Sequence, residues 1–466
     1  MIILTGFFYS LYFMILGFAA RASYHLLNRT ELLIEKKTDF SAHALFLGIF
    51  LHVLIFNMYQ FIGLSNIMAL YFTMFAVVLA SVTIFFLAKK IGFHTVSIKP
   101  TSTNIIALVF IAVCSSIIFW NGIQLPEMAW DSWMVWIGKA NQWANHGVAT
   151  PVYPFDEWLN KPNSIYNESA HYPDALPLLY LLPKLLGWNS YGTLLTFHLI
   201  VFAMMTLLLV SRLERKGAPW YLQLILVIVI YTTPLLNNHL MITGYADIWM
   251  AMFIVIIMLT LIDYHEKGDN GVGITLLCYL AMLPMLKLEG WVWLLLFMIA
   301  HILVSLANNP HRFKLLGIFI GFIFILWILG GLHLNFPFGN IIINSEKIEF
   351  LHLINAKISF SNITSEVLIG FFRQNNWSIL WLGLPFLLVS FVANKQDKAS
   401  QVAHVFFILA LACFFFLFYF TQASQWAKDL TAINRVVLQL VPCYIFLLFK
   451  MLIRLNNIEI KKAQTQ

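Results

Sequence analysis

Charged side chains are scarce in this chain. Only 11% of its 466 residues are Asp, Glu, Lys or Arg, whereas 61% are hydrophobic. Soluble domains contain roughly 25% charged and 45–50% apolar residues, so this composition excludes a water-soluble enzyme. Apolar runs near the ~20 residues that cross the ~30 Å hydrocarbon core of a bilayer recur along the sequence. The sequence therefore predicts an all-α, polytopic integral membrane protein.

Cysteine is also scarce, and a cleavable leader is not indicated. The four cysteines, Cys114, Cys278, Cys413 and Cys443, all lie in apolar runs, where a thiol usually behaves as a small hydrophobic side chain. They predict neither a disulfide framework nor a cysteine-based metal site. Residues 1–17 have no positively charged beginning and no small-residue cleavage site, so we interpret them as a first span.

Dividing the sequence at charged residues and at Gly, Pro and Asn clusters predicts about thirteen membrane spans. They cover 1–20, 41–62, 66–88, 104–120, 190–210, 219–236, 246–263, 273–286, 291–307, 313–333, 377–393, 402–421 and 433–450. Residues 175–188 form a further apolar stretch that contains Pro183 and Lys184. At about 14 residues it is short for a span, which favours a re-entrant or interfacial segment.

With thirteen spans, successive loops lie on alternate sides of the membrane and form two sets. The two sets differ in their number of Lys and Arg residues. The set that includes the C-terminal tail contains 19 of the 28 Lys and Arg residues, and the other set contains nine. Cytoplasmic loops of membrane proteins are enriched in Lys and Arg. We therefore expect the tail to be cytoplasmic and Met1 to be outside. We further expect the membrane to be a bacterial inner (plasma) membrane.

This topology predicts three regions. Residues 1–103 form an N-terminal three-span module, residues 104–450 a functional transmembrane core, and residues 451–466 a cytoplasmic tail. Within the core, residues 121–190 and 334–376 are the two large extracytoplasmic loops, and we expect interfacial helices in the first. Long loops of this kind are where a membrane enzyme or receptor usually places its working surface.

Ionisable residues at or near membrane depth are costly and therefore informative, and five groups of them fall on one predicted side. The first is the WDSW sequence, where Asp131 lies between Trp130 and Trp133. Tryptophans at three- to four-residue spacing predict an amphipathic interfacial helix. Asp131 is then either a simple helix N-cap or a catalytic carboxylate, because aromatic faces stack on sugar rings while a carboxylate accepts a hydroxyl proton.

The second and third groups are HYPD and GYAD. His171 and Tyr172 line a substrate site, or else this segment is only a loop-to-helix junction capped by Asp174. Tyr245 precedes Asp247, which opens a span. An acid in that position is either functional or simply favoured by the helix macrodipole.

The last two groups, KLEG and a late arginine, contain three charged residues. Lys287 and Glu289 interrupt a nearly continuous apolar stretch, and because residues two apart on a helix do not face each other, we expect each to have a different partner. Arg435 stands at the start of the last span. It is either a snorkelling interfacial residue or a phosphate ligand, since a guanidinium binds phosphate oxygens in bidentate fashion.

These five groups, in this order, resemble the GT-C superfamily of polytopic glycosyltransferases, which includes protein O-mannosyltransferases and the aminoarabinose transferase of lipid A. The similarity covers roughly residues 104–450. It consists of the WDSW aspartate, the HYPDALPLLY element, the YAD aspartate, the KLEG element and the arginine before LQLVP. Members usually place the catalytic loop after the first span, whereas three additional spans precede it here.

The resemblance implies a function for this chain. A sugar on a polyprenyl-phosphate carrier is transferred outside the cytoplasm to a glycan, glycolipid or protein acceptor. Asp131 then acts as catalytic base, Lys287 and Arg435 bind the donor phosphate, and Asp247 and Glu289 orient hydroxyl groups. No cofactor is required. Some members hold a divalent metal at such acids, for which Asp131, Asp247, Glu289 and His171 are the available ligands, but we expect none here.

Two other classes of function remain as alternatives. O-antigen polymerases and ligases depend on arginines in external loops, but the predicted external loops here contain only Arg373 and Arg435. Secondary transporters carry intramembrane charges near the midplane of two related halves, but the sequence shows no internal repeat. The sequence therefore favours a monosaccharide transferase that acts on lipid-linked substrates and binds no nucleic acid.

Overall fold

The fold is described by a computed structural model of the whole chain. It describes residues 1–27, 37–91, 102–126, 129–188, 190–307, 330–336, 339–350, 354–393 and 397–465, together with the single positions 314, 321, 324, 325 and 328. Most of the predicted span 313–333 therefore lies outside the described residues.

Within these ranges, nine helices are long and apolar enough to cross a membrane. They are α1 (Ile2–Leu27), α2 (Lys37–Ile62), α3 (Asn66–Ile91), α4 (Ser102–Gly122), α8 (Ser190–Arg215), α11 (Ala246–Lys267), α13 (Gly290–Ala307), α17 (Lys398–Phe420) and α19 (Thr431–Thr465). The prediction of an all-α, polytopic membrane protein is thereby confirmed.

The predicted number of about thirteen spans is not confirmed. Residues 219–236 form two helices, α9 (Trp220–Thr232) and α10 (Pro234–Met241), that bend by 62°, because Pro234 lacks the N–H that would continue α9. The helix α12 (Asn270–Leu286) is only 17 residues long. Residues 377–393 contain the short 3-10 helix η3 (Leu380–Gly383) and the ten-residue α16 (Leu384–Ala393) instead of one long helix.

Smaller elements lie between these helices. In the first loop they are a π-helix η1 (Ser132–Trp136), α5 (Ile137–His146), α6 (Phe155–Trp158), the parallel pair β1 (Val152–Tyr153) and β2 (Ile165–Tyr166), and α7 (Ala175–Leu185). In the second they are the antiparallel strands β3 (Leu332–Phe336), β4 (Gly339–Ile343), β5 (Lys347–Phe350) and β6 (Ile354–Lys357), then α15 (Thr364–Leu368) and the π-helix η2 (Ile369–Arg373), with α18 (Ser424–Lys428) before α19. The four-stranded sheet was not predicted.

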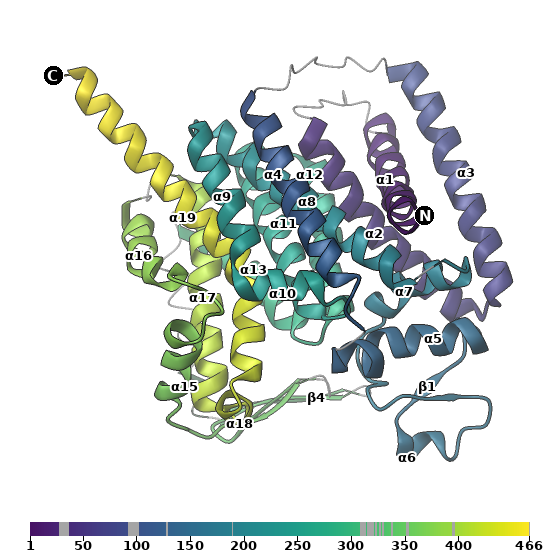
Figure 1. The fold of residues 1–466 in the computed structure, drawn as a ribbon. Coiled ribbons are helices and arrows are strands. Elements are labelled where there is room, and N and C mark those ends of the chain that lie inside the picture. Colours follow the sequence, from purple (N-terminus) through teal and green to yellow (C-terminus); the bar gives the residue numbers. More distant parts are fainter. Residues whose placement is uncertain are drawn as a thin grey trace.

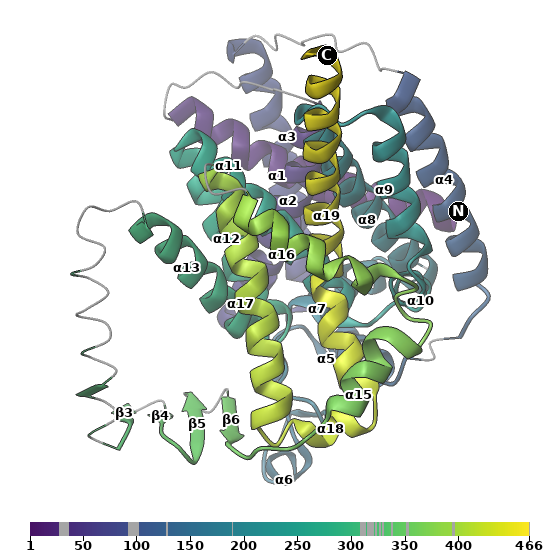
Figure 2. The ribbon, with the colours of Figure 1, turned by 90° about the vertical axis from the view of Figure 1, so that its left-hand side faces the viewer.

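The two ends of the helix bundle differ. Figures 1 and 2 show α5, α6, α18 and the sheet gathered at one end, here called the loop end, whereas α19 runs to the opposite end, here called the tail end. The helix α11 lies at the centre, in contact with α8, α12, α17 and α19. All residues of the apolar stretch in α11 that could cross the membrane are buried inside the protein. By contrast, only 17% of the residues in the corresponding stretch of α3 are buried, which leaves most of α3 to face lipid.

The first three spans contact α5 and α7 directly. Asn66, at the start of α3, donates two hydrogen bonds to the carbonyl groups at the end of α5 and accepts one from the Val148 amide at 2.8 Å. The hydroxyl of Tyr9 and the ring of His52 contact carbonyl groups of α7. These contacts fix α5 and α7 against the bundle.

Candidate functional site

All five polar groups singled out from the sequence lie at the loop end. Asp131 immediately precedes η1, Asp247 lies in the first turn of α11, and Arg435 is the fifth residue of α19. Lys287 and Glu289 occupy the short connection between α12 and α13. Four separate helix ends therefore supply the charged residues of one site.

Arg435 connects two of the predicted carboxylates. Its Nε donates a hydrogen bond of 2.8 Å to Asp247 Oδ2, and its terminal nitrogen is paired with Asp131 Oδ2. The Asp247 side chain is fully buried, whereas 20% of the Asp131 side chain and 29% of the Arg435 side chain are exposed. The site is thus closed at Asp247 and accessible at Asp131 and Arg435.

Lys287 is shared between two carboxylates. Its Nζ lies 2.9 Å from Asp247 Oδ1 and 3.0 Å from Glu289 Oε1. The expectation that Lys287 and Glu289 have different partners is wrong, because these residues do not continue the helix. Lys287 ends α12 with extended backbone angles, and the turn that follows brings the two side chains together.

Gln439 completes the shell around Asp247 and was missed by the sequence analysis. Its Nε2 donates to Asp247 Oδ1 at 2.8 Å, while its Oε1 accepts a bond of 2.6 Å from the Trp293 indole. Gln439 follows Arg435 by four residues, so the two lie on one helix face. A second polar residue four positions after Arg435, on an otherwise apolar helix face, is the sequence feature that could have identified Gln439.

Two glycines allow the loops to approach closely. Gly244 has a φ of +104°, and a Cβ added to it would lie 2.4 Å from the Ser132 Cβ. Any larger residue would push the GYAD segment away from the WDSW segment. A Cβ on Gly290 would lie 2.0 Å from the Leu283 carbonyl oxygen, so glycine is also required where the chain turns from α12 into α13.

The predicted aromatic residues fall into two groups. Trp130 and Trp133 are 53% and 47% exposed and contact each other edge to face. Trp136 and Trp143, which share their helical spacing, are buried in the core. Tyr245 lies beneath Arg435, with 5.1 Å between the guanidinium carbon and the ring centroid, a distance typical of a cation–π contact.

The HYPD segment is held by a residue that the sequence analysis did not identify. The Lys139 side chain is 1% exposed and donates to Asp174 Oδ1 at 2.8 Å, as well as to the Ala170 and Tyr172 carbonyl groups. Asp174 stands at the N-cap of α7 but makes no capping hydrogen bond with its side chain. The interpretation of Asp174 as a cap is therefore wrong, because its carboxylate is paired with Lys139.

This support positions Tyr172 beside the charged site. The Tyr172 ring packs edge to face on Trp136 and lies next to the exposed His171 ring. Burial raises the pKa of the Tyr172 hydroxyl, and the nearby Glu289 carboxylate raises that pKa further. Tyr172 therefore retains its proton, and remains a hydrogen-bond donor, well into the alkaline range.

Substitution of Lys139 should loosen this segment. We expect Lys139→Met to lower the free energy of unfolding by about 1.5–3 kcal/mol, the range for a hydrogen bond to a charged group, and to make residues 147–173 more sensitive to protease. Lys161→Met, in the same loop but exposed, should change stability by less than about 0.5 kcal/mol. Equal protease sensitivity of the two variants would contradict the role given to Lys139.

Several buried polar atoms around the site have no hydrogen-bond partner among the described residues. They are Ser132 Oγ, His239 Nε2, Thr243 Oγ1 and Glu289 Oε2. Most buried polar atoms in proteins are hydrogen-bonded, so each of these has capacity for a polar ligand. Ser132 adjoins Asp131 in sequence and Thr243 adjoins Gly244, which places both hydroxyls where the two loops meet.

The described residues contain no group of three or more His, Cys, Asp and Glu side chains that could hold a metal ion. The cations Arg435 and Lys287 instead lie between the carboxylates of Asp131, Asp247 and Glu289. Cations and carboxylates thus alternate in one network of fixed charges, in which each of the two cations is paired with two carboxylates.

Comparison of this chain with known protein families, curated proteins and solved structures finds no match.

Proposed function

We propose that this chain is a membrane glycosyltransferase that transfers one sugar from a polyprenyl-phosphate carrier to an acceptor outside the cytoplasm. The observation that carries the proposal is the direct pairing of Arg435 with Asp131, two residues 304 positions apart, at an accessible junction that also includes the buried Asp247 and Lys287. A base and two cations in one site are what transfer from a lipid phosphate requires.

Each charged residue has a role in the proposed reaction. The acceptor hydroxyl oxygen forms the new bond to the sugar C1 while the bond from C1 to the phosphate oxygen breaks. Asp131 takes the hydroxyl proton, and the phosphate departs as an anion. Arg435 and Lys287 stabilise the charge that develops on the phosphate, because both present nitrogen donors to the site.

Binding of the donor would also change the state of the base. The guanidinium of Arg435 is paired with Asp131 and Asp247, and a phosphate that enters would compete with Asp131 for it. When a phosphate replaces Asp131 as the partner of Arg435, Asp247 still has Lys287 and Gln439 as hydrogen-bond partners. Donor binding therefore releases Asp131 to accept the proton only when the leaving group is in place.

The surrounding residues suit a sugar. Ser132, His239, Thr243 and Glu289 offer the unpartnered polar atoms described above, and Tyr172 adds a hydroxyl. Trp130 and Trp133 are exposed next to Asp131, where their faces can stack on a sugar ring. His171 is exposed beside Tyr172 and offers a further contact for the acceptor glycan, glycolipid or protein.

The orientation proposed for the protein follows from its charge distribution. The loop end would face outward from a bacterial inner membrane, and the tail end, with its Lys and Arg residues, would face the cytoplasm. The spans within residues 104–450, together with the loops that connect them, would then form the catalytic core around a lipid-linked donor.

Removal of Arg435 should affect the donor first. We expect Arg435→Ala to raise the KM for the polyprenyl-phosphate sugar by roughly 30-fold or more, which corresponds to about 2 kcal/mol, with a smaller effect on the acceptor KM. Steady-state kinetics with each substrate varied in turn would measure both constants. Arg435→Lys keeps the charge but loses the bidentate fork, so its donor KM should be intermediate. An effect confined to the acceptor KM would contradict this role.

The function can be tested even while the identity of the sugar is open. Deletion of the gene in the source organism, followed by mass spectrometry of envelope glycans, lipids and proteins, should show the loss of one monosaccharide from one class of molecule. Expression of the wild-type chain should restore it, and the Asp131→Asn chain should not. An unchanged envelope profile in the deletion strain would contradict the proposal.

A further inference from the structure

A charged cavity lies at the tail end, away from the site described above. It has a volume of about 190 Å³, many times the 10–15 Å³ that one water molecule needs. Four basic residues, Arg212, Arg215, Lys216 and Lys450, and two acidic residues, Asp263 and Glu266, line it. Its lining residues therefore carry two more positive than negative charges, and Asp39 and Asp397 lie just behind them as further carboxylate partners.

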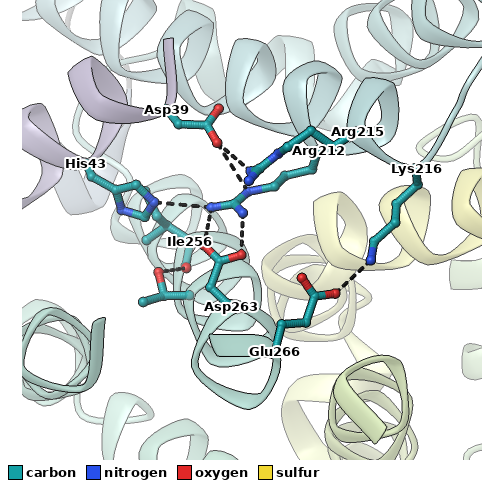
Figure 3. Close-up of polar contacts among 9 residues, drawn as sticks. Asp39, His43, Arg212, Arg215, Lys216, Ile256, Asp263 and Glu266 are labelled. Atoms are coloured by element: carbon teal, nitrogen blue, oxygen red, sulfur yellow. Dashed lines mark hydrogen bonds and ion pairs between the residues drawn. The ribbon is translucent and has the colours of Figure 1, made fainter. Parts of the chain in front are cut away.

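Carboxylates hold the basic side chains of this cavity in place (Figure 3). Arg212 pairs with Asp263, Arg215 with Asp39, and Lys216 with Glu266 at 2.7 Å. Lys450 approaches the cavity from α19, with its Nζ 3.3 Å from Asp397 Oδ2. Asp39 and Asp397 do not line the cavity, so two of the four cations are held by carboxylates outside it.

The Arg212 guanidinium retains donor capacity. Its Nε is buried and donates no hydrogen bond to any described residue, although Asp39 lies 3.8 Å away. Guanidinium groups have five N–H donors, and here the two terminal nitrogens face Asp263 and His43. The Arg212 side chain is thus held mainly by Asp263, with Asp39 as a second and more distant carboxylate.

Polarity in the cavity changes with depth. Leu259 and Phe446, which line it, each lie four residues, or about 6 Å of helix, before the charged Asp263 and Lys450. The apolar wall thus lies toward the middle of the bundle and the basic residues toward its end. An amphipathic anion whose charged group binds at the rim and whose apolar part points inward matches this arrangement.

The cavity also lies at headgroup depth. Asp263 follows Asp247 by 16 residues on α11, and a rise of 1.5 Å per residue separates them by about 24 Å. That distance approaches the ~30 Å hydrocarbon thickness, so the two sites lie near opposite membrane surfaces. With the orientation proposed above, the cavity lies at the depth of the cytoplasmic leaflet, where anionic lipids are found.

We propose that the cavity formed by Arg212, Arg215, Lys216 and Lys450 binds the phosphate group of an anionic ligand, and that this ligand is an anionic phospholipid of the adjacent leaflet. Basic cavities between membrane helices on the cytoplasmic side bind lipid headgroups in this way. Inorganic phosphate shares the charged group, but it would leave the apolar wall of Leu259, Ile262 and Phe446 without a partner. This binding does not depend on glycosyl transfer.

The test uses the full-length protein, purified in detergent. Native mass spectrometry and thermal unfolding would be followed during titration with phosphatidylglycerol, phosphatidylcholine or inorganic phosphate. Lys216→Gln should weaken phosphatidylglycerol binding about fivefold, and the double variant with Lys450→Gln about 25-fold, since each surface lysine contributes roughly 1 kcal/mol. Arg454→Gln removes a charge one turn beyond Lys450 on α19 and should leave binding within twofold of wild type.

Each outcome of this titration bears on the proposal. Preference for phosphatidylglycerol over phosphatidylcholine, lost in the lysine variants, would support the lipid. Displacement by millimolar inorganic phosphate that depends on the same lysines would assign the phosphate site to a soluble ligand. Equal binding of both lipids, or wild-type binding by Lys216→Gln, would overturn the proposal. The Lys216 side chain is 43% exposed, so this single variant should fold even where Lys450→Gln does not.

Discussion

Asp131→Asn should reduce glycosyl transfer by about 10²–10⁴-fold, the contribution typical of a positioned general base. The substitution preserves the size of the side chain and leaves an amide oxygen to accept the hydrogen bond from Arg435, so folding should be nearly unaffected. The lost function is the capacity to take the acceptor proton. Initial transfer rates at saturating donor and acceptor, with protein amount and thermal stability matched, would measure this effect.

Asp156 provides the control for this substitution. It is an exposed aspartate in α6 of the same loop, so Asp156→Asn makes the same chemical change outside the charged site. Its transfer rate should stay within about twofold of wild type, since exposed substitutions usually change little. Full activity in Asp131→Asn would eliminate Asp131 as the base, and an equal loss in both variants would point to a general disturbance of the loop.

Asp247→Ala should destabilise the protein more than Lys139→Met does. Asp247 is fully buried and contacts Lys287, Arg435 and Gln439. Its removal leaves two partly buried cations without their shared carboxylate, a change that typically costs about 3–5 kcal/mol. We expect a strongly reduced melting temperature and poor recovery of folded protein from the membrane, measured by fluorescence-detected size exclusion after heating.

A double variant separates the missing charge from the missing packing. Asp247→Ala combined with Lys287→Met removes one of the two cations, and it should be more stable than Asp247→Ala alone by about 1 kcal/mol or more, because the two sites are coupled. Asp247→Asn, which keeps the shape of the side chain, should lie between the wild type and Asp247→Ala. If the double variant is less stable than either single variant, the proposed charge balance is incorrect.

The meeting of charged residues that lie far apart in the sequence was predictable, because the apolar segments of this chain contain few charged residues. Asp131, Asp247, Lys287 and Arg435 are each costly in an apolar context, and the alternation of spans along the sequence predicts that they share one side of the membrane. The structure brings them within contact of each other. Whether they act on a sugar remains the prediction stated above.

Other features depend on tertiary contacts that the sequence does not display. Lys139 lies in an amphipathic segment where a lysine is ordinary, and only its burial against the HYPD loop reveals its role. Equal tryptophan spacing suggested one face, yet Trp136 is buried while Trp133 is exposed, because the π-helical turn of η1 shifts residues from the 3.6-residue spacing. Segment 377–393 was apolar enough to resemble a span, but apolar length alone does not prevent a helix from ending.

The burial of α11 limits how its length can vary. Residues 248–262 contain no ionisable side chain, yet the helix carries Asp247 at one end and Asp263 at the other, paired with Arg435 of α19 and Arg212 of α8 respectively. One inserted or deleted residue would shift one end by 1.5 Å and rotate it by about 100° relative to the other. Such a change would misalign one set of ion pairs, so the ion pairs at its two ends fix the number of residues in α11. The lipid-facing helix α3 should tolerate the same insertion.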